Sequence, residues 1–406
     1  MKKVLILNTT LNKGGAARVA HDLYESLGSD FEMFFAYGRG KKDSDSKTFY
    51  FGNKLEMFIH IFLVRFLGME GFGSYFSTKK LIRFIKKEKF DLIHMHNLHG
   101  YCLDFFMLIN FLKQNKISVV WTLHDEWTVS PLSAYRLGCK HCTTGTGKCL
   151  NKNNYPKTYF PLMEKWMLNQ KKKVFTHNWN PSLVCPSEWL GNQIRQSYLQ
   201  NLHINVVNNG IDTNLFKPST DKQLLRVRYN LPLDKKIILF IAANFEDKRK
   251  GVSYIVEAAE ILQDKNYLFI GLGKGKLQES INIKNLGYVN DKTKLAEIYS
   301  LSDMFCFTST AETFLLTVAE AFSCGIPALG FDIPVVRELV RNGAGILTTE
   351  NTSQSLAKEI NTLLDNSSKL FEMSQNGRKL IEDNYSKEKF KTGYLKVYND
   401  ILKQNE

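Results

Sequence analysis

Short, continuous runs of apolar residues recur along the chain and predict buried β-strands. Polar residues do not alternate with apolar ones inside these runs, which is the pattern of parallel strands covered by helices on both faces. The runs lie at residues 4–8, 91–95, 118–123, 204–207, 237–243, 267–271, 304–308 and 327–331.

Segments in which apolar residues recur every three or four positions separate these runs and predict amphipathic helices. They include 16–28, 78–88, 252–263, 293–301, 317–324 and 387–404. Repeated strand–helix–strand units form right-handed crossovers and build doubly wound sheets. The sequence therefore predicts an α/β protein of two Rossmann-like domains.

The two sets of elements fall on either side of about residue 200, and a length of 406 residues suits two to three domains. We expect an N-terminal domain over residues 1–200 and a C-terminal domain over 201–385. The last segment, 386–406, is expected to form a helix that packs back near the N-terminal domain. Ligands of open parallel sheets bind outside the carboxyl ends of the strands, so functional residues should follow the apolar runs.

Charge is distributed unevenly between the two halves. Residues 1–200 contain 28 Lys and Arg against 15 Asp and Glu, whereas residues 201–406 contain 26 against 25. With 44% hydrophobic and 23% charged residues, the composition is globular and excludes wholesale disorder, collagen and coiled coil. A basic half beside a neutral half indicates an anionic partner: a membrane surface, a phosphorylated substrate or nucleic acid. Because no recognised RNA- or DNA-binding module is present, we expect no nucleic-acid partner, and a basic nucleic-acid-binding protein is only an alternative.

The basic half contains two segments that suggest binding to a membrane surface. Residues 78–90 (TKKLIRFIKKEKF) have the pattern of a basic amphipathic helix, and the stretch 55–68 is very apolar. An ordinary surface helix packed on the sheet explains the first pattern equally well. No run reaches 18 uncharged apolar residues, so we expect no transmembrane helix, and a peripheral protein on an anionic membrane is the hypothesis.

Seven cysteines in a chain without an evident export signal favour a reducing cytoplasm over a disulfide scaffold. Cys139, Cys142 and Cys149 cluster near His141 and could hold a structural zinc ion. A Gly/Thr-rich loop with reduced thiols is the alternative. No other metal site is expected.

Two glycine-containing segments follow predicted strands. Gly14 and Gly15 stand between the first strand and a helix, where the backbone can approach an anion closely. The segment 271–276 (GLGKGK) superficially resembles a dinucleotide fingerprint, but Lys276 occupies the third glycine position, which disfavours a nicotinamide cofactor.

Charged and polar side chains also follow the predicted strands. The run 248–250 (KRK) suits a diphosphate, and His124 ends the strand at 118–123. Glu312 and Glu320 are eight positions apart; the first is expected in the loop after the strand at 304–308 and the second on the next helix. Both should reach one cleft, where carboxylates can bind vicinal hydroxyls, although two solvated glutamates would give the same spacing.

Together these segments resemble the retaining GT-B glycosyltransferases of family 4. The resemblance rests on GGAAR, WTLHDE, NNGID, KRKG, LGYVND, the E-x7-E spacing and the trailing GIPALGF, in order over nearly the whole chain. It implies two Rossmann-like domains that face a central cleft, with the nucleotide sugar bound by the C-terminal domain and the acceptor by the N-terminal domain.

The resemblance also implies roles for individual residues. Glu312, His124 and Lys250 correspond to catalytic positions: near the donor sugar, at the transferred sugar, and at the donor diphosphate. The remaining donor-binding positions are Gly14, Gly15, Asn244, Arg249, Lys250, Phe314, Leu315, Leu316 and Glu320, of which Glu320 corresponds to the residue that binds the ribose. The chain departs from the family where Asn244 replaces a frequent arginine and Leu315 replaces a glycine.

The implied activity is transfer of a sugar, with retention of configuration, from a UDP- or GDP-sugar to a saccharide or polyprenyl-diphosphate-linked acceptor. Neither a metal ion nor another cofactor is implied. Bacterial capsule, exopolysaccharide or lipopolysaccharide assembly on the cytoplasmic face of the plasma membrane is the implied setting. A GT-B sugar-nucleotide epimerase is the first alternative, and an inactive donor-binding scaffold is another.

Overall fold

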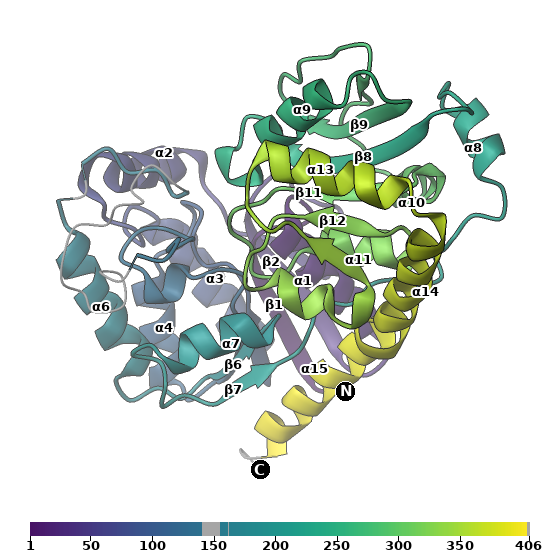
Figure 1. Ribbon diagram of the computed structural model, residues 1–406. Helices are drawn as coiled ribbons and strands as arrows, with labels where there is room; N and C mark the ends of the chain where they lie inside the picture. The colour runs from purple at the N-terminus through teal and green to yellow at the C-terminus, as the bar shows by residue number, and fades with distance from the viewer. Residues whose placement is uncertain (140–154, 161, 404–406) are drawn as a thin grey trace. The chain divides into compact units, whose positions relative to one another are not determined.

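The computed structural model describes residues 1–139, 155–160 and 162–403, and the chain divides into two compact units (Figure 1). Unit 1 comprises Met1–Asn208 and Lys391–Glu406, and unit 2 comprises Asn209–Phe390. Each unit contains one parallel β-sheet with helical connections, so the prediction of two Rossmann-like α/β domains is confirmed.

The sheet of unit 1 has the strand order β3-β2-β1-β4-β5-β6-β7, and all its paired strands run parallel. In its centre, Ile6 of β1 pairs with Phe35 of β2 and with His94 of β4. The strands are β1 (Lys3–Thr10), β2 (Glu32–Arg39), β3 (Thr48–Tyr50), β4 (Leu92–Met95), β5 (Ser118–Thr122), β6 (Ser182–Cys185) and β7 (Ile204–Val206).

Helices connect these strands, and several begin at a side chain that caps them. Asn53, Asp104 and Ser187 accept backbone N–H bonds at the starts of α2, α4 and α7. The helices of unit 1 are α1 (Gly15–Ser26), α2 (Lys54–Phe62), the π-helical turn η1 (Leu63–Leu67), α3 (Tyr75–Glu88), α4 (Phe105–Gln114), the 3-10 turn η2 (Trp127–Val129), α6 (Glu164–Thr176) and α7 (Glu188–Arg195).

The last helix, α15 (Lys387–Lys403), begins in unit 2 and contributes its later turns to unit 1. Tyr394 and Tyr398 are fully buried there. The Tyr398 hydroxyl lies 2.6 Å from His94 Nδ1, and the Tyr394 hydroxyl lies 2.8 Å from the Thr122 hydroxyl. These buried hydrogen bonds make the end of the chain part of the core of unit 1.

The sheet of unit 2 repeats the same topology with the order β10-β9-β8-β11-β12-β13. Its strands are β8 (Lys236–Asn244), β9 (Tyr267–Lys274), β10 (Ile283–Asn285), β11 (Met304–Phe307), β12 (Ala328–Gly330) and β13 (Gly345–Leu347). Its helices are α8 (Lys222–Arg228), the 3-10 turn η3 (Lys248–Lys250), α9 (Val252–Ile261), α10 (Lys292–Leu301), α11 (Leu316–Ser323), α12 (Val336–Leu339), the 3-10 turn η4 (Arg341–Gly343), α13 (Ser353–Leu364) and α14 (Ser367–Asn384).

In both sheets the chain starts in the middle, builds outward on one side and then crosses to the other. This change of direction falls between the neighbouring strands β1 and β4 in unit 1, and between the neighbouring strands β8 and β11 in unit 2. Ligands of doubly wound sheets bind at such a switch point, because the loops at the carboxyl ends of the two strands diverge there. A ligand site is therefore expected at the loops that follow these four strands.

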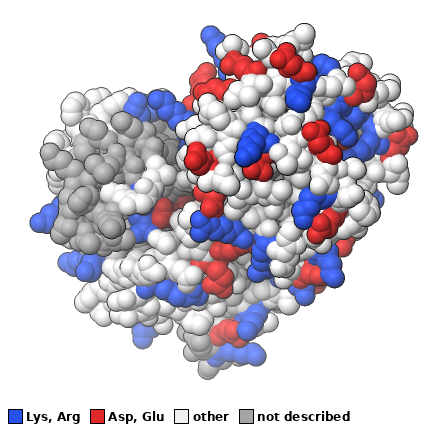
Figure 2. Space-filling view, viewed as in Figure 1, with Lys and Arg blue, Asp and Glu red and all other residues white. Residues whose placement is uncertain are grey.

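The surface agrees with the charge pattern of the sequence in one respect. Figure 2 shows Lys and Arg side chains interspersed with Asp and Glu over unit 2.

Among the described residues, no helix has the length and apolarity that a membrane span requires.

Candidate functional site

A cluster of opposite charges lies at the switch point of unit 2. Strand β8 ends at Asn244, and the chain then forms η3, which Asp247 caps by accepting the Arg249 N–H at 3.0 Å. Gly251 follows with φ of +63°, and a Cβ atom there would lie 2.3 Å from the Thr308 carbonyl oxygen. Glycine at this position thus lets the loop after β8 lie directly against the end of β11.

Glu312 lies in the loop after β11 and joins the two cations of η3. Its Oε1 accepts hydrogen bonds from Lys250 Nζ at 2.6 Å and from Arg249 Nη1 at 2.9 Å. Arg249 Nη1 also donates to the Ala311 carbonyl at 2.8 Å, and Arg249 Nη2 lies 3.2 Å from Asp247. The cluster is therefore fixed by both side chains and backbone.

The cations determine the charge state of Glu312. Burial by itself raises the pKa of the Glu312 carboxyl, but Lys250 and then Arg249 outweigh it, so that its pKa lies below the ordinary value. The side chains of Lys250 and Arg249 are 18% and 20% exposed. An ammonium group has three N–H donors, so Lys250 can bind Glu312 and an anion from solvent together.

The other predicted residues near this cluster differ in their placement. Asn244 is exposed at the end of β8, and its Oδ1 accepts the Glu246 N–H at 3.2 Å. The side chains of Phe314 and Leu315 are buried, and Leu315 immediately precedes α11, which begins at Leu316. This segment therefore has backbone N–H groups at a helix start, rather than side chains, to offer a ligand.

Glu320 lies on α11 and points into unit 2. It is only 1% exposed, and its Oε2 accepts a hydrogen bond from the Tyr299 hydroxyl at 2.9 Å. The structure thus brings Arg249, Lys250 and Glu312 together, whereas it places the carboxylate of Glu320 in the interior beside Tyr299.

In unit 1 the glycine loop follows β1, as the sequence predicts. Gly14 precedes α1 with φ of +93°, a conformation that favours glycine. A Cβ atom at either Gly14 or Gly15 would have no neighbour within 4 Å. Backbone conformation, rather than crowding, therefore accounts for Gly14, and the start of α1 is open.

Three histidines form a stack at the carboxyl ends of β4 and β5. The His94 and His96 rings lie 4.3 Å apart, and His96 Nδ1 is 2.8 Å from His124 Nε2. Burial lowers the pKa of His124 to about 4 and keeps the pKa values of His94 and His96 well below the ordinary value. All three are therefore neutral imidazoles near neutral pH.

A small pocket, with room for about one water molecule, opens beside this stack. Its lining residues are His96, Asn97, Leu98, His99, Trp121, Thr122, Leu123, His124, Asp125, Trp127 and Thr128. His96 Nε2 and His99 Nδ1 are buried there without a hydrogen-bond partner among the described residues. These two ring atoms are polar groups next to the pocket whose hydrogen bonding is unsatisfied within the described residues.

His99 differs from its neighbours because its Nε2 lies 2.8 Å from Asp125 Oδ2. Burial lowers the pKa of His99, but the charge and hydrogen bond of Asp125 outweigh burial and raise it. The sequence analysis identified His124 and missed His96, His99 and Asp125. The repeated histidines of HMHNLH, directly after a predicted strand, were the signal that could have identified the first two.

Mild acid should destabilise unit 1. Burial lowers the pKa of His60 to about 3 and that of His124 to about 4, and those of His94 and His96 also fall. Below a pH of about 6.5 the unfolded chain binds protons at these positions while the folded chain does not. The free energy of unfolding should therefore fall with decreasing pH, by about 1.4 kcal/mol per pH unit and per histidine.

Tryptophan fluorescence during denaturant unfolding measures this effect selectively, because all five tryptophans lie between residues 121 and 189. The raised pKa of His99 has the opposite effect on the free energy of unfolding, but it concerns one histidine, whereas four histidines have lowered pKa values. His124→Gln should flatten the pH dependence, because it removes one of the four histidines whose pKa values burial lowers. An unfolding midpoint that is the same at neutral and mildly acidic pH would refute the prediction.

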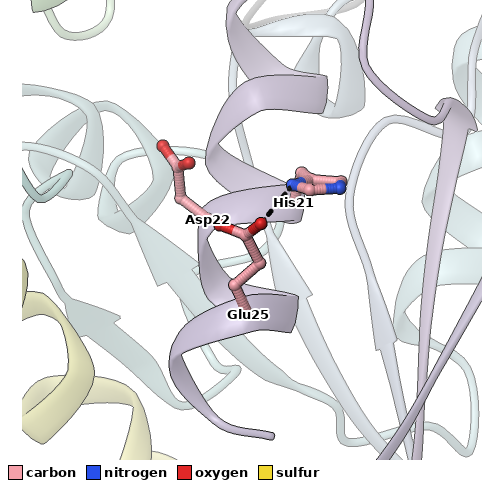
Figure 3. Close-up of side chains that lie close together, drawn as sticks. All are labelled: His21, Asp22 and Glu25. Atoms are coloured by element: carbon pink, nitrogen blue, oxygen red, sulfur yellow. Dashed lines mark ion pairs between the residues drawn. The ribbon is translucent and has the colours of Figure 1, made fainter.

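The predicted zinc cluster lies largely outside the described residues. Of its cysteines only Cys139 is described, and it is a buried free thiol. Within the described part of the chain, the group of potential metal ligands is His21, Asp22 and Glu25 on α1 (Figure 3). His21 Nδ1 and Glu25 Oε1 lie 3.7 Å apart, as an i,i+4 pair on a helix surface.

Both halves of the chain match known glycosyltransferase families. Residues 13–215 match the sequence profile described as Glycosyltransferase Family 4, and residues 221–380 match the one described as Glycosyl transferases group 1. The putative colanic acid biosynthesis glycosyl transferase WcaC of Escherichia coli K12 is 27% identical over 363 residues, which cover 86% of this chain and 87% of that protein.

Two further proteins are similar to this chain. The UDP-Gal:α-D-GlcNAc-diphosphoundecaprenol α-1,3-galactosyltransferase of Escherichia coli is 26% identical over 58% of this chain and 63% of its own length. The solved structure of Alr3699/HepE from Anabaena, in complex with UDP-glucose, superimposes with a TM-score of 0.72 at 17% identity and covers 98% of this chain and 100% of that one. The likeness to Alr3699/HepE shows that the two proteins share a fold.

Proposed function

Because this chain belongs to Glycosyltransferase Family 4, we propose that it transfers a sugar, with retention of configuration, from a nucleoside-diphosphate sugar to a saccharide acceptor. The observation that carries this proposal is the cluster of Lys250, Arg249 and Glu312 at the switch point of unit 2. Two ordered, partly exposed cations beside an ionised carboxylate suit a ligand that carries a diphosphate and a polyhydroxy sugar together.

Each member of the cluster has a separate task in the proposal. Breaking the bond between the anomeric carbon and the diphosphate leaves negative charge on the leaving group, and Lys250 with Arg249 stabilises that charge. Glu312 accepts a hydrogen bond from the donor sugar and holds the Lys250 ammonium in place. Backbone N–H groups at Leu315 and Leu316 add donors at the start of α11. Asn244 at the end of β8 binds the donor beside them, and Glu320 on α11 binds the ribose.

The proposed reaction needs no reactant other than the donor and the acceptor. The acceptor hydroxyl forms the new bond at the anomeric carbon from the face that the diphosphate leaves, and its proton passes to the departing phosphate oxygen. The transition state resembles an oxocarbenium ion, as in glycoside hydrolysis. For unit 1 we propose that His124 serves the transferred sugar as a neutral hydrogen-bonding group, and that the loop at Gly14 and Gly15 leaves room for the acceptor.

The acceptor in this proposal is linked to a polyprenyl diphosphate, and the setting is bacterial surface-polysaccharide assembly at the cytoplasmic face of the plasma membrane. Two relatives support it by name: one is a putative colanic acid glycosyl transferase, and the other acts on a diphosphoundecaprenol-linked sugar. The excess of basic over acidic residues in residues 1–200, 28 against 15, also suits an acceptor that carries a diphosphate.

A thermal-shift panel of nucleotide sugars tests donor binding. A ligand that binds only the folded protein stabilises it by about 2.7 kcal/mol at one hundred times its dissociation constant. We expect one UDP- or GDP-sugar to raise the melting temperature by several degrees, and the free sugar to have no effect. A panel in which no nucleoside diphosphate or nucleotide sugar changes the melting temperature would contradict the proposal.

A further inference from the structure

Helix α2 has its polar residues inside and its apolar residues outside. Glu56 and His60, one turn apart, are buried. The Glu56 carboxylate accepts the backbone N–H groups of Phe76 and Ser77 at 2.6 and 2.8 Å. His60 Nδ1 lies 2.8 Å from the Ser74 hydroxyl. Because its polar face is satisfied against the start of α3, α2 cannot rotate its apolar face inward without breaking these bonds.

The opposite face of α2 and η1 is a continuous apolar stripe. Leu55 is 68% exposed, Phe58 64% and Phe62 56%, and Phe62 stacks on Phe66 at 4.8 Å. The stripe continues onto Tyr159 and Phe160, whose rings lie 5.8 and 6.4 Å from that of Phe66. We call this set the aromatic surface: Leu55, Phe58, Ile59, Phe62, Phe66, Tyr159 and Phe160. Figure 1 shows α2 at the periphery of unit 1.

The segments that form the aromatic surface, together with the adjoining helix α3, are basic. The segments 54–67, 75–88 and 155–160 contain eight Lys and Arg against two Asp and Glu, and one of the two acids is the buried Glu56. Lys157 lies over the Tyr159 ring at 5.0 Å, and Lys79 on α3 lies over the Tyr75 ring at 4.3 Å. An apolar centre with a lysine rim is complementary to acyl chains beneath anionic headgroups.

Helix α3 itself is not the apolar element. Leu81 and Ile85 on its apolar face are buried in the core of unit 1, with 0% and 2% exposure. The apolar face of the 78–90 segment therefore packs in unit 1, as the alternative of a packed surface helix expects, and is not available to a membrane. Binding of a membrane surface by the basic residues of this segment stays a prediction. Lys79 lies over the Tyr75 ring at the start of α3, whereas Lys80 and Lys86 lie over the rings of Phe49 and Phe111.

We propose that the aromatic surface docks unit 1 on an anionic lipid bilayer, with α2 in the plane of the interface. The phenylalanines enter the acyl boundary while Lys54, Lys79 and Lys157 contact headgroups. Docking brings the enzyme to a lipid-linked acceptor, and this purpose rests on the proposed function. Bilayer binding is nevertheless measurable without any sugar transfer.

Sedimentation of the full chain with unilamellar vesicles tests the proposal. The vesicles consist of phosphatidylcholine alone or mixed with phosphatidylglycerol. Wild-type protein should bind the anionic vesicles, and added salt should weaken binding. Phe58→Ser combined with Phe62→Ser should lower the partition coefficient roughly tenfold or more for each phenylalanine that inserts. Phe371→Ser on α14, where the side chain is 67% exposed, is the matched control and should leave partition unchanged.

Two results would overturn the inference. One is equal partition of the wild-type protein, the double variant and the Phe371→Ser control. The other is a lipid-free dimer that the double variant converts to a monomer while vesicle binding stays at the wild-type level, because the aromatic surface would then join two copies of the chain. The thermal shift given by nucleotide sugars should be the same in all three proteins. A missing thermal shift with intact docking would refute the transferase proposal alone.

Discussion

Replacing Glu312 with alanine is expected to reduce sugar transfer by about 1,000-fold or more while unit 2 stays folded. The variant removes the acceptor of the 2.6 Å bond from Lys250 and of the 2.9 Å bond from Arg249. Both cations then lose the group that orients them, and the sugar loses a hydrogen-bond acceptor, which together account for losses of that size at preorganised sites. Release of nucleoside diphosphate in the presence of acceptor measures the effect.

The control for this experiment is Glu350→Gln, because Glu350 is exposed on the same unit and follows β13, two strands away from β11 in the sheet. Lys250 and Arg249 are partly exposed, so water can solvate them once the carboxylate is removed, and the melting temperature should fall by only a few degrees. Wild-type turnover by a folded Glu312→Ala protein would show that the cluster has no part in the reaction.

Replacing Lys250 with methionine is expected to weaken binding of the donor diphosphate by about 10- to 100-fold. A hydrogen bond between an ammonium and a phosphate contributes about 1.5–3 kcal/mol, and methionine keeps the apolar stem without the charge. The loss should be largest for the nucleoside diphosphate and absent for the nucleoside. Calorimetric titration with the two ligands makes that distinction.

Lys248 provides the matched control for Lys250. It lies on the same short helix, η3, but it is exposed and forms no bond with Glu312 among the contacts of the described residues. Lys248→Met should therefore bind the diphosphate as the wild-type protein does, and Lys250→Arg should retain much of the affinity because the charge remains. Equal losses in Lys248→Met and Lys250→Met would indicate a diffuse electrostatic effect rather than a site.

The predicted runs correspond to eight strands, β1, β4, β5, β7, β8, β9, β11 and β12, whereas β2, β3, β6, β10 and β13 were missed. Strands β1, β8 and β9 are long and apolar, so their runs stand out from the surroundings. β3, β10 and β13 are three-residue edge strands with partly exposed side chains, which give no continuous apolar run. β2 lies within a run that begins with Glu32 and ends at Gly38-Arg39, and this mixture concealed it.

The candidate site was predictable to the extent that it follows strands. Arg249, Lys250 and Glu312 each stand just after an apolar run, and the adjacency of β8 and β11 brings them together. That adjacency depends on the whole topology, so their mutual bonds were not predictable from spacing. The burial of Glu320 against Tyr299 was not predictable either, because a partner on α10 is needed to satisfy the carboxylate.

Helix α2 shows a different limit of sequence reading. The sequence identified residues 55–68 only as a very apolar stretch that suggests binding to a membrane surface, and it predicted neither a helix there nor which residues face outward. The buried partners of Glu56 and His60 lie eleven to twenty-one residues further along the chain, in the segment that leads into α3 and in its first turn. Only the folded arrangement shows that these polar side chains occupy the inner face and leave Phe58 and Phe62 outside.

The measurement that tests the central claim most directly follows a labelled sugar. Purified protein is incubated with membranes of its native host and with radiolabelled UDP- and GDP-sugars, and lipids are then extracted into organic solvent. We predict that one donor transfers its label to a lipid-linked saccharide with the wild-type protein and not with Glu312→Ala. Label that stays in the nucleotide sugar or its epimer, or that reaches lipid equally with both proteins, would contradict the account.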